Sequence, residues 1–304
     1  MAQPQAVGMI GLGIMGSAMS YNLLRAGFPV IGYDVSDQAR KAHEKAGGKV
    51  AKSVAEVAKG VETLITSLPS YKALAAVSEE LGASTKSSHV VIETSTMPIA
   101  VKEAARAAVA KSGAVLLDCP LSGTGAQARA KDLLVYVSGD RKAYDRVAKV
   151  MDGFSRAHHY IGAFGDGSKM KFVANLLVAI HNVAAAEAMV LGMKAGLDPA
   201  TVLKVVADGA GGSRMLQVRG PMMVAGDYSE ATMKVEVWQK DMTIIGDFVR
   251  ELDCPAPLFA ASGPIYNAAM AMGLAKEDTG AVCRVLEEMA GAPRRARRAS
   301  NGRR

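Results

Sequence analysis

The chain has 304 residues, half of them hydrophobic, so it is long enough for two domains with a large buried core. Its formal net charge of +7 would favour a nucleic-acid partner. However, six arginines lie in residues 294–304, and they leave the rest of the chain close to neutral. We therefore expect residues 293–304 to form a disordered basic tail, and we expect no nucleic-acid partner.

The cysteine pattern and the hydropathy argue against several other classes of protein. Three cysteines lie far apart and form no Cys-X-X-Cys pair, which favours a reducing compartment over a disulfide framework or a zinc site. The five histidines form no ligand cluster, so we expect no metal. The N-terminal residues lack the basic region of a secretory signal, and no stretch has 18 uninterrupted apolar residues. We expect a cytoplasmic protein that does not bind a membrane.

From residue 7 to about residue 161, short runs rich in β-branched residues alternate with helical stretches. This alternation predicts βαβ units and a mainly parallel, doubly covered sheet. The later strands follow one another closely, so part of the sheet can be antiparallel. The predicted strands are residues 7–10, 29–33, 63–66, 89–92, 114–117, 133–137 and 158–161. The predicted helices include residues 15–26, 101–111 and 142–151.

The first predicted strand runs into the glycine-rich turn Gly11-Leu12-Gly13-Ile14-Met15-Gly16. With this spacing, the first glycine permits a tight turn and the second lets the backbone approach a pyrophosphate. The third glycine allows the next helix to pack closely on the strand. The N–H groups at the start of that helix would then point at the phosphates. These six residues are predicted to bind a dinucleotide.

The second predicted strand ends in an acidic residue, Asp34. A carboxylate at this place can accept hydrogen bonds from both ribose hydroxyls of the adenosine half, and it would repel a 2′-phosphate. We therefore expect NAD to be preferred over NADP. The alternative is that Asp34 is an ordinary loop residue.

Two further strand ends carry small polar residues, Ser67-Leu68-Pro69-Ser70 and Thr94-Ser95-Thr96-Met97-Pro98. Ligands of open α/β sheets lie over the carboxyl ends of the strands. The backbone N–H of Leu68, the neighbouring Pro69 and the hydroxyl of Thr96 are therefore candidates to contact the nicotinamide half. Simple turn chemistry before two helices would explain the same residues.

A third polar loop, Asp118 to Gly125, follows another predicted strand. Its small residues expose backbone N–H groups, and Ser122 and Thr124 add hydroxyls, which makes a nest for a carboxylate. A flexible turn would have the same composition.

From residue 168 onward only helices are predicted, at about residues 168–195, 199–209, 230–252, 259–273 and 278–290. Three glycines in residues 162–167 interrupt the pattern before them, which places a domain boundary there. The sequence thus predicts a sheet domain over residues 1–164, an all-helical domain over residues 165–292 joined through a long helix, and the tail.

The long helix carries a lysine and an asparagine among apolar residues. Lys171 and Asn175 are four positions apart and share one face, whereas Lys169 should face solvent. A desolvated lysine near a helix N-terminus loses its proton more readily, so Lys171 can exchange a proton with a substrate hydroxyl, and Asn175 can hold that substrate. The alternative is a surface lysine at a helix start.

Taken together, these motifs resemble the β-hydroxyacid dehydrogenase family, which includes 3-hydroxyisobutyrate dehydrogenase and tartronate semialdehyde reductase. The resemblance rests on GLGIMGSAMSYNLLRAGFPVIGYD, TSTMP, DCPLSGTGAQA, GDGSKMKFVANLL and WQKD, which span nearly the whole chain before the tail. It implies a dinucleotide domain joined to a helical domain, an active site between them, and a homodimer or homotetramer. Carried over by position, it implies a catalytic Lys171, a substrate site of Ser122, Gly123, Thr124 and Asn175, and cofactor contacts from Thr96 and Lys240.

The chain departs from the family pattern at three places. Thr124 replaces the last glycine of a common Ser-Gly-Gly loop, and Asn175 is followed by Leu176 where a second asparagine is frequent. Many relatives carry an aromatic residue at the position of Arg214. We hypothesise that Arg214 or Arg219 meets a second anionic group of the substrate; a role in helix packing is the alternative.

The function predicted from these features is NAD-dependent hydride transfer to or from the hydroxyl-bearing carbon of a small 3-hydroxyacid, with Lys171 as general acid and base. A closely related alternative is an NADPH-linked reductase of 2-hydroxy-3-oxopropionate (tartronate semialdehyde) or a related aldehyde acid. Two alternatives come from other classes: a non-catalytic dinucleotide-binding sensor module, and a nucleic-acid-binding protein that acts through its arginine tail.

Overall fold

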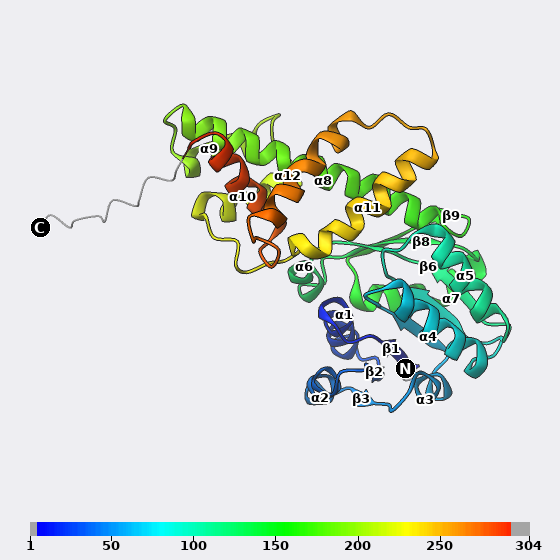
Figure 1. The fold of residues 1–304 in the computed structure, drawn as a ribbon. Coiled ribbons are helices and arrows are strands. Elements are labelled where there is room, and N and C mark those ends of the chain that lie inside the picture. Colours follow the sequence, from blue (N-terminus) through cyan, green and yellow to red (C-terminus); the bar gives the residue numbers. More distant parts are fainter. Residues whose placement is uncertain (1–4, 293–304) are drawn as a thin grey trace, which may run out of the picture. The chain divides into compact units, whose positions relative to one another are not determined.

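The computed structural model describes residues 5–292 and divides the chain into two compact units, Met1–Ala174 and Asn175–Arg304 (Figure 1). The division falls inside one long helix, ten residues after the boundary predicted at residue 164. The arginine-rich tail predicted to be disordered lies outside the described residues.

The first unit is built on one sheet of short strands in the order β3-β2-β1-β4-β5-β6-β8-β7, with β9 also paired to β8. β1 through β6 are parallel wherever they pair, β8 is antiparallel to β6 and β7, and β9 is parallel to β8. The strands are β1 (Val7–Ile10), β2 (Val30–Tyr33), β3 (Lys49–Val50), β4 (Thr63–Thr66), β5 (Val90–Glu93), β6 (Val115–Asp118), β7 (Leu121–Ser122), β8 (Leu134–Ser138) and β9 (Ala157–Gly162). The order 3-2-1-4-5-6 is that of a Rossmann-type dinucleotide-binding fold.

Both faces of this sheet are buried, because successive strand residues alternate between two hydrophobic cores. The helices of the unit are α1 (Ile14–Arg25), α2 (Asp37–Lys45), α3 (Val54–Gly60), α4 (Tyr71–Ser84), α5 (Ile99–Ala110), α6 (Gly125–Arg129) and α7 (Arg141–Phe154). Met9 and Ile65 lie in the core that α1 and α7 cover, whereas Leu64 and Val91 lie in the core that α3, α4 and α5 cover.

The predicted fold class is confirmed, including the mixed pairing of the later strands. Each of the seven predicted strands corresponds to an observed one within a residue or two at its ends. The two that were not predicted, β3 and β7, have only two residues each and therefore no readable periodicity.

The second unit is helical: within residues 175–292 the backbone forms no strand, only an isolated antiparallel bridge between Lys234 and Asp278. Its elements are the greater part of α8 (Asp166–Lys194), α9 (Pro199–Asp208), α10 (Arg214–Ala225), α11 (Val235–Glu251), α12 (Pro257–Ala271), the 3-10 turn η1 (Thr279–Ala281) and α13 (Val282–Met289). α10 was not predicted.

Aromatic residues and polar bonds hold the centre of this unit together. The hydroxyl of Tyr266 donates to the Ala179 carbonyl at 3.1 Å and accepts from the amide of Asn182 at 3.1 Å, and the Tyr266 ring lies 6.2 Å from that of Trp238. Burial raises the pKa of Tyr266 to about 12, so its phenol keeps the proton that it donates. These contacts join α8, α11 and α12.

Among the described residues, α8 is the one helix whose length and hydropathy would allow it to cross a membrane. The central helix of a globular domain has the same properties. Asn182 lies fully buried in the middle of α8 and bonds to Tyr266, as expected for a helix packed against protein.

Candidate active site

The glycine-rich turn has the geometry that its spacing predicts. Gly11 has a φ of +91°, and a side chain there would collide with the Ser67 carbonyl; a side chain at Gly16 would collide with the Gly11 carbonyl. A Cβ at Gly13 would meet no atom within 4 Å, so the backbone there is open to a ligand. Gly13 is also the N-cap of α1 and provides no side-chain cap, which leaves the first-turn N–H groups to an anion.

Asp34 stands directly beside this turn. Its Oδ2 accepts a hydrogen bond from the Leu12 N–H at 2.7 Å, and its Oδ1 accepts from the Ser36 N–H at 2.8 Å. Arg40 of α2 donates to the Asp34 carbonyl at 2.5 Å and pairs with Asp37. The carboxylate is therefore fixed between the end of β2 and the glycine-rich turn, where a ribose would lie.

The loops after β4 and β5 are joined to each other at the same edge of the sheet. The Leu68 N–H donates to the Ser95 hydroxyl at 2.9 Å, and the Thr94 hydroxyl donates to the Thr66 carbonyl at 2.7 Å. Leu68 and Thr96 are partly exposed, and Pro69 is exposed. These residues thus lie at the carboxyl edge that β1 also reaches, as the sequence predicts.

The loop after β6 is more ordered than a flexible turn. Gly123 has a φ of +136°, and a Cβ there would lie 2.7 Å from Leu133, so only glycine fits. Thr124 begins α6 with a capping box: its hydroxyl accepts from the Gln127 N–H at 3.4 Å, and its own N–H donates to the Gln127 side chain at 3.0 Å. The backbone N–H of Thr124 is therefore already bonded within the chain, whereas Ser122 lies at the partly exposed end of β7.

The first turns of α8 pack on the sheet and carry two buried polar side chains and one exposed lysine. Gly167 packs so closely on the sheet that a Cβ would lie 2.5 Å from the Tyr136 carbonyl. Lys171 is 8% exposed and Asn175 is 4% exposed, whereas the Lys169 side chain is 52% exposed and pairs with Asp166 at 2.9 Å. The predicted burial of Lys171 and Asn175 and the predicted exposure of Lys169 are confirmed.

Asn175 and Lys240 meet at one carboxylate in the second unit. The Asn175 amide donates to Asp241 Oδ2 at 3.0 Å, and the Lys240 ammonium lies 3.3 Å from Asp241 Oδ1. Asp241 is buried, whereas the Lys240 side chain is about one-third exposed. Asp241 thus orients the amide that is predicted to hold the substrate.

Arg219 is not a candidate substrate ligand. Its side chain is 2% exposed, and its Nε donates to Asp278 Oδ1 at 2.9 Å. Asp278 also accepts from the N–H and hydroxyl of Thr232, both at 2.8 Å. Of the two arginines considered, Arg219 therefore has the packing role, and only Arg214, the first residue of α10, stays a candidate.

Sequence reasoning missed a cluster of buried charges under the site. Lys102 of α5 contacts Glu93 at 2.8 Å and Asp118 at 2.5 Å, and all three side chains are fully buried. The sequence gives one signal of this cluster, because an acid directly follows each of two predicted strands, residues 89–92 and 114–117. A lysine in an amphipathic helix, however, is usually taken for a surface residue.

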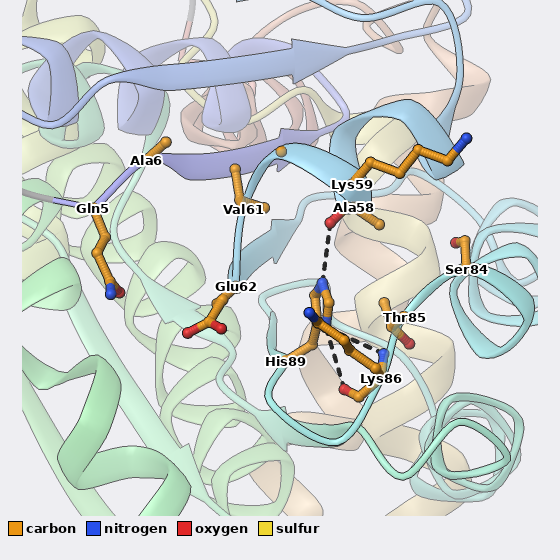
Figure 2. A pocket seen from close by; sticks show the side chains of 11 residues that line it. Gln5, Ala6, Ala58, Lys59, Val61, Glu62, Ser84, Thr85, Lys86 and His89 are labelled. Carbon is orange, nitrogen blue, oxygen red and sulfur yellow. Dashed lines mark hydrogen bonds between the residues drawn. The ribbon is translucent and has the colours of Figure 1, made fainter.

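A separate cavity of about 500 Å³ lies at the amino ends of β1, β4 and β5, the opposite edge from the glycine-rich turn (Figure 2). The His89 ring on its wall bonds the Ala58 carbonyl at 3.0 Å and the Lys86 N–H at 3.1 Å. The Thr85 hydroxyl bonds Ser112 at 2.7 Å. Its buried polar groups are thus used for structure, and we do not assign it to the reaction.

Comparisons with known proteins agree with this geometry. Residues 6–162 match the family model described as the NAD binding domain of 6-phosphogluconate dehydrogenase. Residues 165–286 match the model described as NAD-binding of NADP-dependent 3-hydroxyisobutyrate dehydrogenase.

Whole proteins match over nearly the full chain. L-threonate dehydrogenase of Cupriavidus necator is 32% identical, with 92% of this chain and 95% of that protein covered. The mitochondrial 3-hydroxyisobutyrate dehydrogenase of Mus musculus is 31% identical over 95% of this chain and 89% of its own length. The crystal structure of 3-hydroxyisobutyrate dehydrogenase from Salmonella typhimurium superposes with a TM-score of 0.83 at 30% identity, covering 92% of this chain and 99% of that one. The chain therefore belongs to the β-hydroxyacid dehydrogenase family of NAD(P)-dependent oxidoreductases.

Proposed function

We propose that this protein catalyses reversible hydride transfer between NAD and the hydroxyl-bearing carbon of a small 3-hydroxyacid. The observation that carries the proposal is the pair Lys171 and Asn175, which are both more than nine-tenths buried and lie one turn apart on α8. Charged and amide side chains are seldom buried without a functional or structural partner. Family membership supports the reaction class, namely a hydroxyacid dehydrogenase.

The residues of the first unit fit a nicotinamide dinucleotide. The open backbone at Gly13 and the uncapped start of α1 suit a pyrophosphate, and Asp34 suits the two ribose hydroxyls of the adenosine half. The bound nicotinamide would supply or accept the hydride. Thr96 and Lys240 are proposed to contact its nicotinamide side.

The preference for NAD is inferred from charge. A 2′-phosphate beside Asp34 would bring two anions together, at a cost of about 4 kcal/mol for one charge pair at 4 Å and intermediate dielectric. Arg40 is the first basic residue after β2, and its side chain already pairs with Asp37 and bonds to the Asp34 carbonyl.

Lys171 is proposed to carry the proton. In the oxidative direction its amine takes the proton of the substrate hydroxyl as the hydride leaves the same carbon, and the ammonium then releases this proton to solvent. In the reductive direction the ammonium protonates the oxygen of the carbonyl as it is reduced. The positive charge also stabilises the oxygen while it gains negative charge.

The substrate carboxylate is proposed to bind at Ser122, Gly123 and Thr124, with Asn175 holding the hydroxyl or the carboxylate. Because the capping box uses the N–H of Thr124 and Ser122 is paired with Leu134 in the ladder of β7 and β8, the N–H of Gly123 and the Ser122 hydroxyl are expected to bind the carboxylate most directly. The hydroxyl of Thr124 accepts a bond in the capping box and can still donate its proton.

The test is a spectrophotometric NADH assay over 3-hydroxyisobutyrate, glycerate, threonate and 3-hydroxypropionate, with NAD and NADP each as oxidant. Lys171→Ala is expected to lower kcat by about 10²- to 10⁴-fold, the usual contribution of a general acid and base. Lys169→Ala is the matched control: it removes an exposed lysine two residues away and should leave kcat unchanged. Full turnover by Lys171→Ala would refute the proposal.

The same assay separates the alternatives. A strong preference for NADPH with aldehyde acids would favour a reductase related to tartronate semialdehyde reductase. NADH binding without turnover of any tested acid or aldehyde would favour a dinucleotide-binding sensor.

We further propose that the protein is a homo-oligomer. Leu177, Ala184 and Leu191 are exposed on α8 at intervals of seven residues, and Val173 continues the same face. An apolar seam with this spacing on one helix suits a second copy. Multi-angle light scattering should give at least the dimer mass; a monomer at micromolar concentration would exclude this assembly.

A further inference from the structure

Three fully buried charged side chains meet beneath the carboxyl ends of β5 and β6. The Lys102 ammonium lies 2.8 Å from Glu93 Oε2 and 2.5 Å from Asp118 Oδ1, and none of the three side chains reaches solvent. Glu93 and Asp118 are the last residues of adjacent parallel strands and stand opposite each other in register. We refer to Lys102, Glu93 and Asp118 as the buried triad.

Through Asp118 the triad holds the beginning of α8. The Ser168 N–H donates to Asp118 Oδ2 at 2.8 Å, and the Ser168 hydroxyl donates to Oδ1 at 2.8 Å. The Ser138 hydroxyl donates to Oδ2 at 3.1 Å and accepts from the Gly167 N–H at 2.9 Å. The first N–H groups of α8 are thus satisfied by β6 and β8, and the carboxylate faces the positive end of the helix.

Through Glu93 the triad also holds two cofactor loops. Glu93 Oε1 accepts from the Ser95 N–H at 2.9 Å, and the Ser95 hydroxyl accepts from the Leu68 N–H at 2.9 Å. The neighbouring residue is Thr96, which is proposed to contact the nicotinamide. One ion cluster therefore connects the loops after β4 and β5 with the helix that carries Lys171.

Stability alone is a poor reason to bury such a cluster. Removing three charges from water costs several kcal/mol for each ion, and well-packed apolar residues of similar volume often stabilise a protein equally well or better. Burial lowers the pKa of Lys102, but the carboxylates of Asp118 and Glu93 outweigh that effect and hold its pKa above the ordinary value. Lys102 is therefore charged at every physiological pH, and the triad is a fixed charge arrangement rather than a switch.

We propose that Lys102 is a positioning residue: it holds Asp118 and Glu93 in place, and they fix the first turn of α8 and the Thr96 loop. Lys171 lies one turn after Ser168, so a shift of Ser168 moves the proton-transferring amine. A misplacement of about 1 Å at a reacting group can lower the rate about 10²-fold. This inference rests on the proposed role of Lys171.

The inference predicts a specific split between kinetic constants. The carboxylate of Asp34 bonds to Leu12 and Ser36 at the end of β2, which β1 and β4 separate from β5, so binding of the adenosine half should not depend on the triad. Loss of the triad should lower kcat, because proton transfer needs the correct placement of Lys171. A merely structural role would lower the melting temperature and the active fraction, without altering the rate constants of the folded molecules.

The test compares Lys102→Met with the double variant Lys102→Met/Glu93→Gln, which keeps the native buried net charge because one charge of each sign is removed. For both, kcat per folded molecule should fall about 10- to 100-fold, while the Kd for ADP-ribose, which lacks the nicotinamide and is measured by calorimetry, stays within about twofold of wild type. The pH profile of kcat should also move, because the surroundings of Lys171 change. Lys111→Met, which breaks an exposed pair with Glu79, is the matched control and should match wild type.

A milder variant covers the case in which neither triad variant folds. Ser168→Ala removes one hydrogen bond to Asp118 and keeps all three charges. It should lower kcat about tenfold with unchanged NADH binding, since a hydrogen bond to a charged group contributes about 1.5 kcal/mol or more. Wild-type kcat in the folded triad variants, or in Ser168→Ala if they do not fold, would overturn the inference. If Lys171→Ala is inactive in the same series, the proposed function still stands; if Lys171→Ala is active, the proposed function itself fails.

Discussion

The carboxylate of Asp34 accepts a hydrogen bond from the backbone N–H of Leu12 at 2.7 Å, although the two residues lie 22 positions apart. This bond joins the end of β2 to the glycine-rich turn at the end of β1. It places a negative charge at the position where the adenosine ribose of a dinucleotide lies in this fold. Cofactor preference is therefore expected to depend on this one side chain.

Replacement of Asp34 by asparagine should weaken the proposed preference for NAD. The variant loses an ionised acceptor for ribose hydroxyls, and a hydrogen bond to a charged group contributes about 1.5–3 kcal/mol. The kcat/KM for NAD should fall about 10- to 100-fold, and that for NADP should rise because the repulsion of the 2′-phosphate is removed. Steady-state kinetics with both cofactors measures the ratio. An unchanged ratio would show that Asp34 does not select the cofactor.

Two glycines of the same turn should respond differently to alanine. Gly16→Ala forces a methyl group into the Gly11 carbonyl, so the free energy of unfolding should fall by about 1–3 kcal/mol. Gly13→Ala meets no protein atom, so its melting temperature should stay near that of wild type. Its methyl group nevertheless occupies the space of the pyrophosphate, so NADH should bind roughly tenfold or more weakly.

Thermal denaturation and NADH fluorescence titration of both glycine variants test this contrast. Tight NADH binding by Gly13→Ala would mean that the dinucleotide does not approach the turn at that residue. Wild-type stability of Gly16→Ala would mean that α1 can move away from β1 at little cost.

Much of the fold could be predicted from the sequence because parallel strands buried on both faces are continuous β-branched runs, as in Val90–Glu93. α10 could not be predicted, because Gly220 and Pro221 interrupt its pattern. Ser213 nevertheless caps that helix by accepting a bond from the Leu216 N–H at 3.1 Å. Local signals therefore identified the elements that have clear periodicity and missed those that tertiary contacts stabilise.

The same distinction between local signals and tertiary contacts applies to the candidate site. The glycine-rich turn and Asp34 follow from spacing within one βαβ unit. The bond between Lys102 and Asp118 spans 16 residues and that between Asp118 and Ser168 spans 50, and neither leaves a local pattern. The sequence leaves Arg219 as a candidate substrate ligand, because its partner Asp278 lies 59 residues away and no local pattern connects the two.

The buried pair of Arg219 and Asp278 should make the protein sensitive to acid. Burial raises the pKa of Asp278, but Arg219 and the hydrogen bonds from Gly280, Thr232 and Met233 outweigh this and lower it below 3.8. A lowered folded pKa gives stabilisation that is present above pH 3.8 and is lost as the pH falls through the folded value.

Asp278→Asn should therefore lose about 3–5 kcal/mol of unfolding free energy at pH 7, because Arg219 stays buried without its counter-charge. Its stability should also change less than that of wild type between pH 5 and pH 3. Urea unfolding at several pH values measures both effects. Parallel pH dependence in the two proteins would show that Asp278 does not determine the acid sensitivity.

His43 should produce a second pH effect at a higher pH. Burial lowers the pKa of its imidazole below 6.5, and the nearby backbone of Lys49 and Val30 offsets this only in part. Between the folded pKa and 6.5 the unfolded chain binds more protons than the native protein, so stability falls as the pH falls through this interval and levels off below it.

The His43 ring has no room to move, since it lies against Gly32 and Gly48, where any added Cβ would collide with it. His43→Gln should retain the fold, with a bond to Ser20 still possible, and should lose this pH dependence. Urea unfolding of both proteins between pH 5 and pH 8 is the measurement, and equal slopes would assign the effect to another group.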